Sequence, residues 1–392
     1  MVVVYARWMF ARALLHRGWW LVTSLYLVVE AQLSPLQLIF IGTAQGIAVL
    51  CFEVPTGLVA DNTSRKWSIV ISHLLMGSAM LATSMVVSYP LLLLTQILWG
   101  ISWTFSSGAD VAWLTDEVDE PADTGRYLGI AARWELIGSA IGLAVFGLLA
   151  WWVSMALSMA VAGCLMLLLS FIVITQFTEQ RFKKNESSNL ASLRTTLHEG
   201  LALAKAGKVI FTVLAVTFLV NGADELFTRL FAKRLVEMGM PQIVEPILWL
   251  TLLGVVTLAV GAVALRVVEA RLREEGSIRV LYCAGCVLGA AGLVLFAGAP
   301  NYLVGMSGVL LIHGLAWNVV RVVGVIWLNN HARSESRATL QSFLSFSENL
   351  GEITLGFALG LFAQMAGISL AVSVAGVLAL IAGYLVFKCH TS

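Results

Sequence analysis

The chain has 392 residues, of which 59% are hydrophobic and only 12% are charged. Soluble domains usually carry about 25% charged residues, so this composition excludes an ordinary soluble protein. The formal net charge is +1, which gives no sign of the basic surface that nucleic acids require. Because a membrane-spanning helix needs about 20 mainly apolar residues, the length suffices for about twelve spans with short loops.

Apolar runs between charged and turn residues predict an all-α membrane protein with about twelve spans. In chain order they are expected at residues 13–30, 38–60, 67–87, 91–115, 126–150, 153–177, 208–231, 246–267, 277–298, 302–328, 339–365 and 368–387. The longest polar interruption lies near the middle. It divides the chain into an N-terminal six-helix half (1–177), a cytoplasmic central linker (178–207) and a C-terminal six-helix half (208–392).

The distribution of basic residues predicts the orientation in the membrane. Most of the 24 Lys and Arg residues fall in segments on the side of the N-terminus, whereas Lys233 and Arg234 fall on the other side. Cytoplasmic loops carry the excess of Lys and Arg. We therefore expect a multi-pass protein of the cell membrane (plasma or inner membrane) with both termini cytoplasmic.

The two halves repeat each other in sequence. Gly100, Trp103, Trp113 and Leu114 in the fourth span match Gly314, Trp317, Trp327 and Leu328 in the tenth, and Glu135 and Gly138 in the fifth match Glu348 and Gly351 in the eleventh. A duplicated six-helix unit is one of the architectures of secondary transporters, whose substrate site lies near the bilayer midplane between the halves.

A short motif follows the second span. Residues 57–66 read Gly-Leu-Val-Ala-Asp-Asn-Thr-Ser-Arg-Lys, which resembles the Gly-x-Leu-Ala-Asp-Arg-x-Gly-Arg-Lys signature between helices two and three of the major facilitator superfamily (MFS). Val59, Asn62 and Ser64 depart from that pattern. Together with the twelve spans, the central linker and the duplication, the motif extends the resemblance over the whole chain and implies the MFS fold of two pseudo-symmetric halves.

The resemblance implies a cytoplasmic gate at this motif. A small residue lets two helices approach, and an acid and a base on a tight turn can latch the halves. The expected members are Gly57, Asp61, Arg65, Lys66, Asp116 and Glu117, with Arg65 meeting Asp116 or Glu117. The alternative is a solvated loop whose charges only set the topology.

Within the superfamily the chain resembles the drug and metabolite efflux branch, with two departures. Gln96 stands four residues before Gly100, where such antiporters often have Arg, and Leu143 takes the position of a Pro in the glycine-rich fifth helix.

Acidic residues inside predicted spans are candidates for proton coupling, because a carboxyl group at membrane depth is costly and usually faces a partner or a wet cavity. Glu348 and Glu352 lie one helical turn apart and share a face, so that double ionisation is disfavoured and one can load and release a proton. The full set of candidates is Glu348, Glu352, Glu53, Asp110, Glu135 and Asp224. Each has a structural alternative, such as a hydrogen-bonded acid or a hydrated helix end.

Three arginines close to the spans are the expected charge partners of these acids. From depth alone we expect Arg321 beside Glu348, and Arg133 beside Asp110. Arg229 lies four residues after Glu225 and can neutralise it. This assignment leaves Asp224 without a local partner, pointing into a cavity or toward the outer surface, where Asn221 and Gly222 permit a bend.

Aromatic and amide side chains on the fourth, seventh and tenth spans are the expected lining of a substrate cavity. The resemblance implies that helices four and ten line the central cavity, where ring faces suit a lipophilic or cationic solute; the alternative for each single ring is simple helix packing. The candidates are Gln96, Trp99, Trp103, Asn221, Trp317 and Asn318. His73 and His313 have apolar neighbours and are expected to be packed side chains.

The preferred interpretation is a secondary active transporter that works by alternating access, most specifically by proton-coupled efflux of a small lipophilic or cationic solute. The alternatives are an uptake or lipid-moving carrier on the same fold, and a receptor or scaffold that moves nothing. An enzyme is not expected, since no HExxH, nucleophile elbow or Walker loop is present. No cofactor or metal is expected, because Cys283 and Cys286 lie in an apolar run without other ligands. The expected partners are a small-molecule substrate, protons and the lipid bilayer, with the protein acting as a monomer.

Overall fold

The computed structural model describes residues 2–118, 123–182, 184, 207–240, 245–271, 277–332 and 337–389. Over these residues the chain is helical, without a β-strand, and the predicted all-α fold class is confirmed. Nine of the described helices are long and apolar enough to cross a membrane. Most of the predicted central linker lies outside the described residues.

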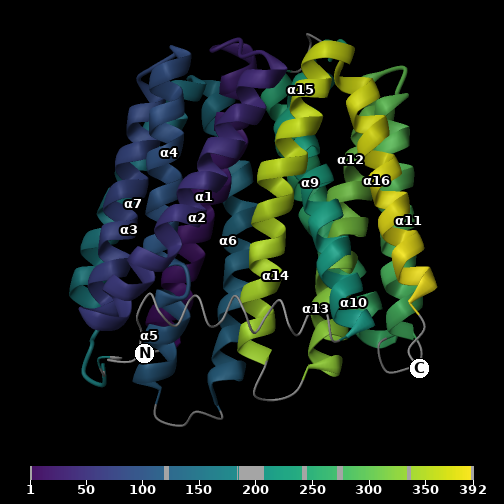
Figure 1. The fold of residues 1–392 in the computed structure, drawn as a ribbon. Coiled ribbons are helices and arrows are strands. Elements are labelled where there is room, and N and C mark those ends of the chain that lie inside the picture. Colours follow the sequence, from purple (N-terminus) through teal and green to yellow (C-terminus); the bar gives the residue numbers. More distant parts are fainter. Residues whose placement is uncertain are drawn as a thin grey trace. The chain divides into compact units, whose positions relative to one another are not determined.

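The helices of the first half are α1 (Val2–Val29), α2 (Pro35–Asn62), α3 (Arg65–Ser84), α4 (Tyr89–Ser106), α5 (Ala109–Glu117), α6 (Thr124–Trp152) and α7 (Met155–Gln176) (Figure 1). Those of the second are α9 (Lys208–Glu237), α10 (Pro246–Arg271), α11 (Ser277–Ala297), α12 (Tyr302–Val309), η2 (Leu310–Ala316), α13 (Trp317–His331), α14 (Arg337–Gly351), η4 (Glu352–Gly356), α15 (Phe357–Ala366) and α16 (Ile368–Lys388). Here η marks a π-helical segment.

The first, fourth and seventh predicted spans differ from the structure as follows, and the tenth and eleventh contain the π-helical segments η2 and η4. The first begins at Val2 rather than at residue 13, because the α-helix continues through Arg7 and Arg12. The fourth is divided into α4 and α5 at Ser107 and Gly108. Gly108 has a φ of 77°, a left-handed conformation that glycine adopts without steric cost. The seventh, in which Asn221 and Gly222 permit a bend, is one continuous α-helix.

Polar caps explain where several helices begin. Ser64 accepts the backbone N–H of Trp67 at the start of α3, and Ser154 accepts that of Leu157 at the start of α7. Asn301 does the same for Val304 in α12. Each side chain satisfies a backbone donor that the first turn of a helix leaves without a partner.

The chain packs into two compact units. Unit 1 comprises residues 1–33, 44–190 and 242–255, and unit 2 comprises 34–43, 191–241 and 256–392. The first residues of α2 belong to unit 2, and the first residues of α10 belong to unit 1.

The same helix pairing recurs in both units. In unit 1, α1 packs on α6 and α7, and α3 packs on α4 and α7. In unit 2, α9 packs on α14 with η4 and on α16, and α11 packs on α12 with η2 and on α16. Each unit therefore has the helix order expected of one copy of a duplicated six-helix half.

Glycines matched by the sequence repeat have the same packing role in the two units. A Cβ added to Gly138 of α6 would collide with the carbonyl oxygen of Phe10 on α1. A Cβ added to Gly351 of α14 would collide with that of Phe218 on α9. In both places the absence of a side chain lets two helices cross in backbone contact, as small residues do in membrane proteins.

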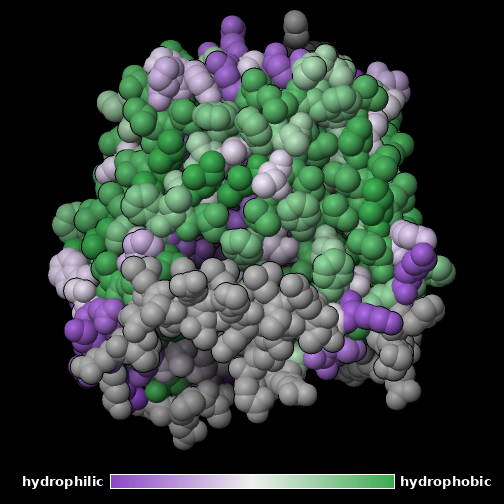
Figure 2. All heavy atoms as spheres, viewed as in Figure 1, coloured by the Kyte–Doolittle hydropathy of each residue, from purple (hydrophilic) through white to green (hydrophobic). Residues whose placement is uncertain are grey.

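Hydrophobic side chains cover most of the middle of the face in Figure 2, and hydrophilic ones gather mainly toward the helix ends. This distribution is expected of helices whose middle sections lie in hydrocarbon.

The close crossing of α1 and α6 generates a prediction for Gly142, whose added Cβ would collide with the carbonyl of Leu14. We expect Gly142→Ala to cost about 1–3 kcal/mol of stability, because the two backbones have to separate. Gly129→Ala on the same helix is the matched control, since an added Cβ there meets no atom within 4 Å. Thermal unfolding in detergent measures both, and an equal loss in the two variants would contradict the prediction.

Candidate functional site

A charged cluster in unit 1 joins the start of α3 to α5. The guanidinium of Arg65 forms an ion pair with Asp116 and donates a hydrogen bond of 2.7 Å to the carbonyl of Ala112. Asp61, four residues earlier at the end of α2, lies 3.9 Å from the same guanidinium. The expected contact of Arg65 with the acidic end of the fourth span is therefore present, at Asp116.

The second acid expected at this contact has another role. Glu117 accepts the backbone N–H groups of Gln180 and Arg181, each at 2.7 Å, and so ties α5 to the segment after α7. Glu117 does not pair with Arg65, because its carboxylate points to these donors. The sequence placed Asp116 and Glu117 at the correct end of the fourth span. It did not show that the two acids face different partners.

Sequence reasoning missed Glu179, which completes this cluster. Its carboxylate accepts the Ser64 hydroxyl at 2.5 Å and the backbone N–H of Arg65 at 2.8 Å. Lys66, an expected gate residue, joins through its backbone N–H at 3.1 Å. An acid at a helix N-terminus satisfies free N–H groups and complements the helix dipole. In the sequence, the signal for this site was Ser64, which caps the N-terminus of α3.

The small residue of the motif does not make the expected close contact. A Cβ added to Gly57 would meet no atom within 4 Å, so the expectation that Gly57 brings two helices together is wrong here. Glu53, one turn earlier on α2, is half-buried. Its carboxylate makes neither a hydrogen bond nor an ion pair with the part of the chain that the structure describes.

Asp110 pairs with an arginine that sequence reasoning did not select. Arg12 of α1 lies 3.0 Å from the Asp110 carboxylate, with side-chain exposures of only 10% and 13%, and donates a second hydrogen bond to Ser106 at 3.1 Å. The expected pair of Asp110 with Arg133 is wrong. The break at Ser107 and Gly108 starts a new helix whose first turn holds Asp110, and Arg133 is exposed on α6.

Aromatic rings from α1 and α4 cluster beside this pair. The imidazole of His16 stacks on Trp99 with 5.3 Å between ring centroids and lies 5.5 Å from Trp103. Trp103 also packs under the guanidinium of Arg12 at 4.8 Å. Trp103 and Glu135, two of the sequence candidates, line one pocket of unit 1.

Gln96 does not belong to this pocket. Its side chain is 1% exposed and donates to the Thr83 hydroxyl at 3.2 Å, which places it in the packing of α4 against α3. The expectation that Gln96 lines a cavity is therefore wrong in unit 1.

In unit 2 the charged residues gather around the two π-helical segments. Asp224 of α9 lies 2.8 Å from Nε2 of His313 in η2, and the Thr228 hydroxyl lies 3.3 Å from the same nitrogen. The expectation that Asp224 lacks a local partner is wrong. His313, which was expected to be only a packed ring, is the polar partner of Asp224. His73 in unit 1, by contrast, is buried as expected and accepts the Trp8 indole N–H at 3.0 Å.

Next to this pair, Glu225 and Arg229 form the expected ion pair, at 2.8 Å and with 11% and 13% side-chain exposure. Glu352 is the first residue of η4 and lies within electrostatic range of Asp224, Glu225 and Arg229. Helices α9 and η4 meet closely here, since a Cβ on Gly356 would stand 2.9 Å from the Glu225 side chain. π-Helical turns inside α-helices often occur at functional sites.

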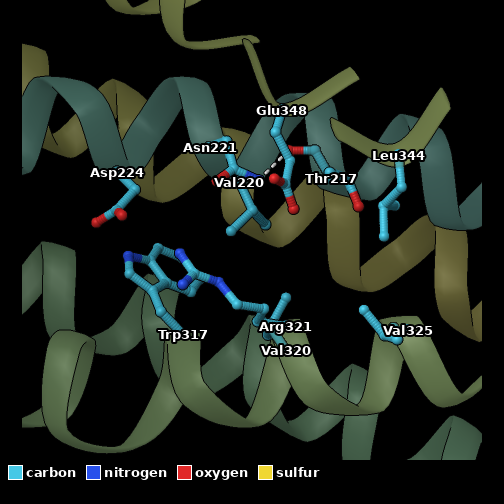
Figure 3. A pocket seen from close by; sticks show the side chains of 11 residues that line it. Thr217, Val220, Asn221, Asp224, Trp317, Val320, Arg321, Val325, Leu344 and Glu348 are labelled. Atoms are coloured by element: carbon cyan, nitrogen blue, oxygen red, sulfur yellow. Dashed lines mark hydrogen bonds between the residues drawn. The ribbon is translucent and has the colours of Figure 1, made fainter. Parts of the chain in front are cut away.

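A small polar pocket opens between α9, α13 and α14 (Figure 3). Trp317 and Arg321 point into it from α13, and Asn221 and Glu348 face them from the other helices. Glu348 and Arg321 interact electrostatically, but the expected direct ion pair is not formed. The pocket volume is about 30 Å³, room for one or two waters.

The side chain of Asn318 bonds to the backbone of the preceding helical turn and does not line this pocket. Its amide donates to the carbonyl oxygens of His313 at 2.7 Å and Gly314 at 3.2 Å, two carbonyls of the widened η2 turns. The structure therefore brings together two of the three amide or aromatic candidates of unit 2, Asn221 and Trp317, and leaves Asn318 apart.

Comparison with known families agrees with this arrangement. Residues 8–354 match the family model described as Major Facilitator Superfamily. The chain belongs to the Major Facilitator Superfamily. Its family and fold are those of MFS transporters, which are generally not enzymes.

Solved structures of MFS proteins share this fold. A mutant of the nucleoside transporter NupG has a TM-score of 0.84 at 15% identity, with 98% of each chain covered. The peptide transporter POT in complex with sulfate has 0.80 at 11%, over 98% of this chain and 93% of that one. A bacterial homolog of the human lysosomal transporter Spinster has 0.77 at 13%, over 98% and 95%. No curated protein sequence matches this MFS chain.

The contacts of Arg65 generate a prediction about coupling energies. In double-mutant cycles we expect Arg65→Ala and Asp116→Ala to be coupled by about 1 kcal/mol or more, because the pair is direct and partly buried. Arg65→Ala and Asp61→Ala are the matched control, with an expected coupling below about 0.5 kcal/mol because their charges are farther apart. Unfolding free energies in detergent give both values, and a reversed order would show that the latch lies at Asp61.

Proposed function

We propose that this MFS protein is a secondary active transporter that moves a small solute across the membrane by alternating access and couples this movement to protons. Family membership supports transport in general. The observation that carries proton coupling is the excess of acids around α9, η2 and η4 in unit 2.

The charges in this region do not balance when every acid is ionised. Four carboxyl groups face two guanidinium groups and one imidazole; they are Asp224, Glu225, Glu348, Glu352, Arg229, Arg321 and His313. A net charge at membrane depth is costly. Binding of protons is the simplest way to balance these groups, and their release restores the charge.

Glu352 is the acid best placed for this role. Its neighbours Asp224 and Glu225 each have a partner in direct contact, His313 and Arg229 respectively, whereas Glu352 makes no ion pair within the described residues. Like charges at close range disfavour full ionisation. The water-sized pocket beside Glu348 supports a hydrated path for protons rather than a site for the solute.

We further propose that the Arg65 cluster is the cytoplasmic gate, with Asp61, Asp116 and Glu179 holding the start of α3. A latch of this kind has to open in every cycle, and partly exposed ion pairs of modest energy suit that need. Both termini and this gate are proposed to face the cytoplasm, in keeping with the distribution of basic residues.

For direction we propose efflux, as in the drug and metabolite branch that the chain resembles. The rings of Trp99 and Trp103 beside Arg12 and Glu135 support a solute with aromatic character. Uptake on the same scaffold would reverse the flux, and lipid movement would change its cargo.

The proposal predicts that a pH gradient drives solute movement in proteoliposomes. The panel consists of ethidium, a planar lipophilic cation, and radiolabelled nucleosides, which are neutral ring compounds. We expect at least one member to accumulate against its gradient, and Glu352→Gln to reduce accumulation about tenfold or more, because a group that carries the proton is lost.

Glu237→Gln serves as the control, because Glu237 is an exposed acid at the end of α9 and is paired with Lys233 at 3.9 Å. It should leave accumulation unchanged. Flux that ignores the pH gradient would remove proton coupling, and no flux of any panel member would favour a receptor or scaffold.

A further inference from the structure

Unit 2 contains an apolar groove of about 530 Å³ between α10, α11 and the segment formed by η2 and α13. Every residue that lines it is alanine, glycine, valine or leucine. The volume is more than three times that of a cavity of about 150 Å³, which holds one benzene molecule. The groove is therefore large enough for a flexible hydrocarbon chain.

The groove separates α10 from the helix that follows it in the chain. Helix α11 packs extensively on α12, η2 and α13, whereas α10 has no comparable backbone contact with α11 or α13 over the residues that the structure describes. Protein interiors are normally packed as closely as organic crystals. A space of this size between two neighbouring helices is therefore expected to hold an occupant.

One row of side chains on α10 shows that the groove is open on one side. Ala259, Val263 and Val267 are spaced four residues apart and share a face of the helix, and the two valines are 61% and 55% exposed. Ala284 on the wall formed by α11 is exposed as well. Both helices are long and apolar enough to cross a membrane. An open groove with only aliphatic walls is stable in hydrocarbon and costly in water, so its surroundings are the lipid chains of the bilayer.

The length of the groove matches one leaflet. The lining of α10 extends from Ala259 to Val268, which at 1.5 Å per residue corresponds to about 14 Å. Half of a hydrocarbon core of about 30 Å is about 15 Å. Because Val268 lies in the last turn of α10, the groove extends from the middle of the bilayer to one of its surfaces.

Two arginines stand where the groove reaches this surface. Arg271 continues the row of Val263 and Val267 by one more turn, and Arg266 lies three residues after Val263 on the same side. Both arginines are exposed. Glu269 lies about 200° around the helix from Val267 and so faces away from the row. A guanidinium binds the oxygens of a phosphate through two parallel hydrogen bonds.

We propose that the groove binds one acyl chain of a phospholipid and that Arg266 and Arg271 hold the phosphate of the same lipid. Basic groups between membrane helices at the cytoplasmic surface are suited to lipid head groups. The connection to α11 (272–276) lies outside the described residues, and a phospholipid without net charge satisfies the same two arginines through its phosphate. The lipid fills the space beside α10 and is not itself moved, so the inference goes beyond the proposed transport function.

Photolabelling of the full-length protein in detergent tests the proposal. The probe is a phosphatidylcholine with a diazirine in one acyl chain, and peptide mass spectrometry locates the label. We expect labelling on the groove walls of α10 and α11. Unlabelled palmitoyl-oleoyl phosphatidylcholine should suppress it at about fivefold lower concentration than palmitoyl-oleoyl glycerol, because the glyceride lacks the phosphate that the arginines bind.

Four variants separate the chain site from the phosphate site. Ala284→Trp should reduce labelling of α10 about fivefold, because the indole occupies the space of the chain. Ala291→Trp, at an exposed position of α11 outside the lining, should leave it unchanged. Arg271→Gln should bring the two competitors to within about twofold of each other. Arg126→Gln, which changes an exposed arginine at the start of α6, should preserve their difference.

Labelling of α10 that neither lipid suppresses would show contact with the micelle only and would overturn the site, as would equal losses in Ala284→Trp and Ala291→Trp. Equal competition by the two lipids in the unchanged protein, or an unchanged preference in Arg271→Gln, would overturn the role of the phosphate even if Ala284→Trp failed to fold. None of these measurements requires a pH gradient or flux. Failure of the lipid site and failure of the proposed transport function are therefore distinguishable.

Discussion

Charge neutralisation inside apolar helix bundles is the constraint on which both units depend. A charged group at membrane depth is tolerated when a partner or water meets it. Arg12 with Asp110 joins α1 to α5, and Asp224 with His313 joins α9 to η2. Each pair links helices far apart in the sequence and so favours one rotation of each helix over others. Such pairs specify an arrangement more than they add stability.

Hydropathy was sufficient to place the spans along the chain, although not the start of α1 or the break at Gly108, and matched residues were sufficient for the duplication, because both depend on patterns along the sequence. Pairing between helices depends on which way each helix faces, and depth alone does not determine that. The sequence-based prediction therefore paired Asp110 with Arg133. In the structure the break at Gly108 turns Asp110 toward Arg12. The pair of Asp224 with His313 was missed for a related reason, because η2 departs from the α-helical spacing.

The duplicated scaffold carries different chemistry in its two copies. Gly138 and Gly351 make equivalent backbone crossings, yet the polar groups around them have diverged. Unit 1 has rings, a neutralised arginine and a pocket of the size of one ring, whereas unit 2 has acids and a pocket of the size of water. The proposed function assigns recognition of the solute to the rings of unit 1 and proton coupling to the acids of unit 2.

The two π-helical segments change the angular phase of their helices. An α-helix advances about 100° per residue, and a π-turn accommodates one residue more than an α-turn. The helix beyond η4 is thus rotated by about 100° relative to an uninterrupted α-helix. Arg337 and Phe357, on either side of η4, cannot be projected onto one helical wheel. A single-residue deletion within η4 would restore the uniform α-helical spacing and leave every later side chain of α15 at its present azimuth.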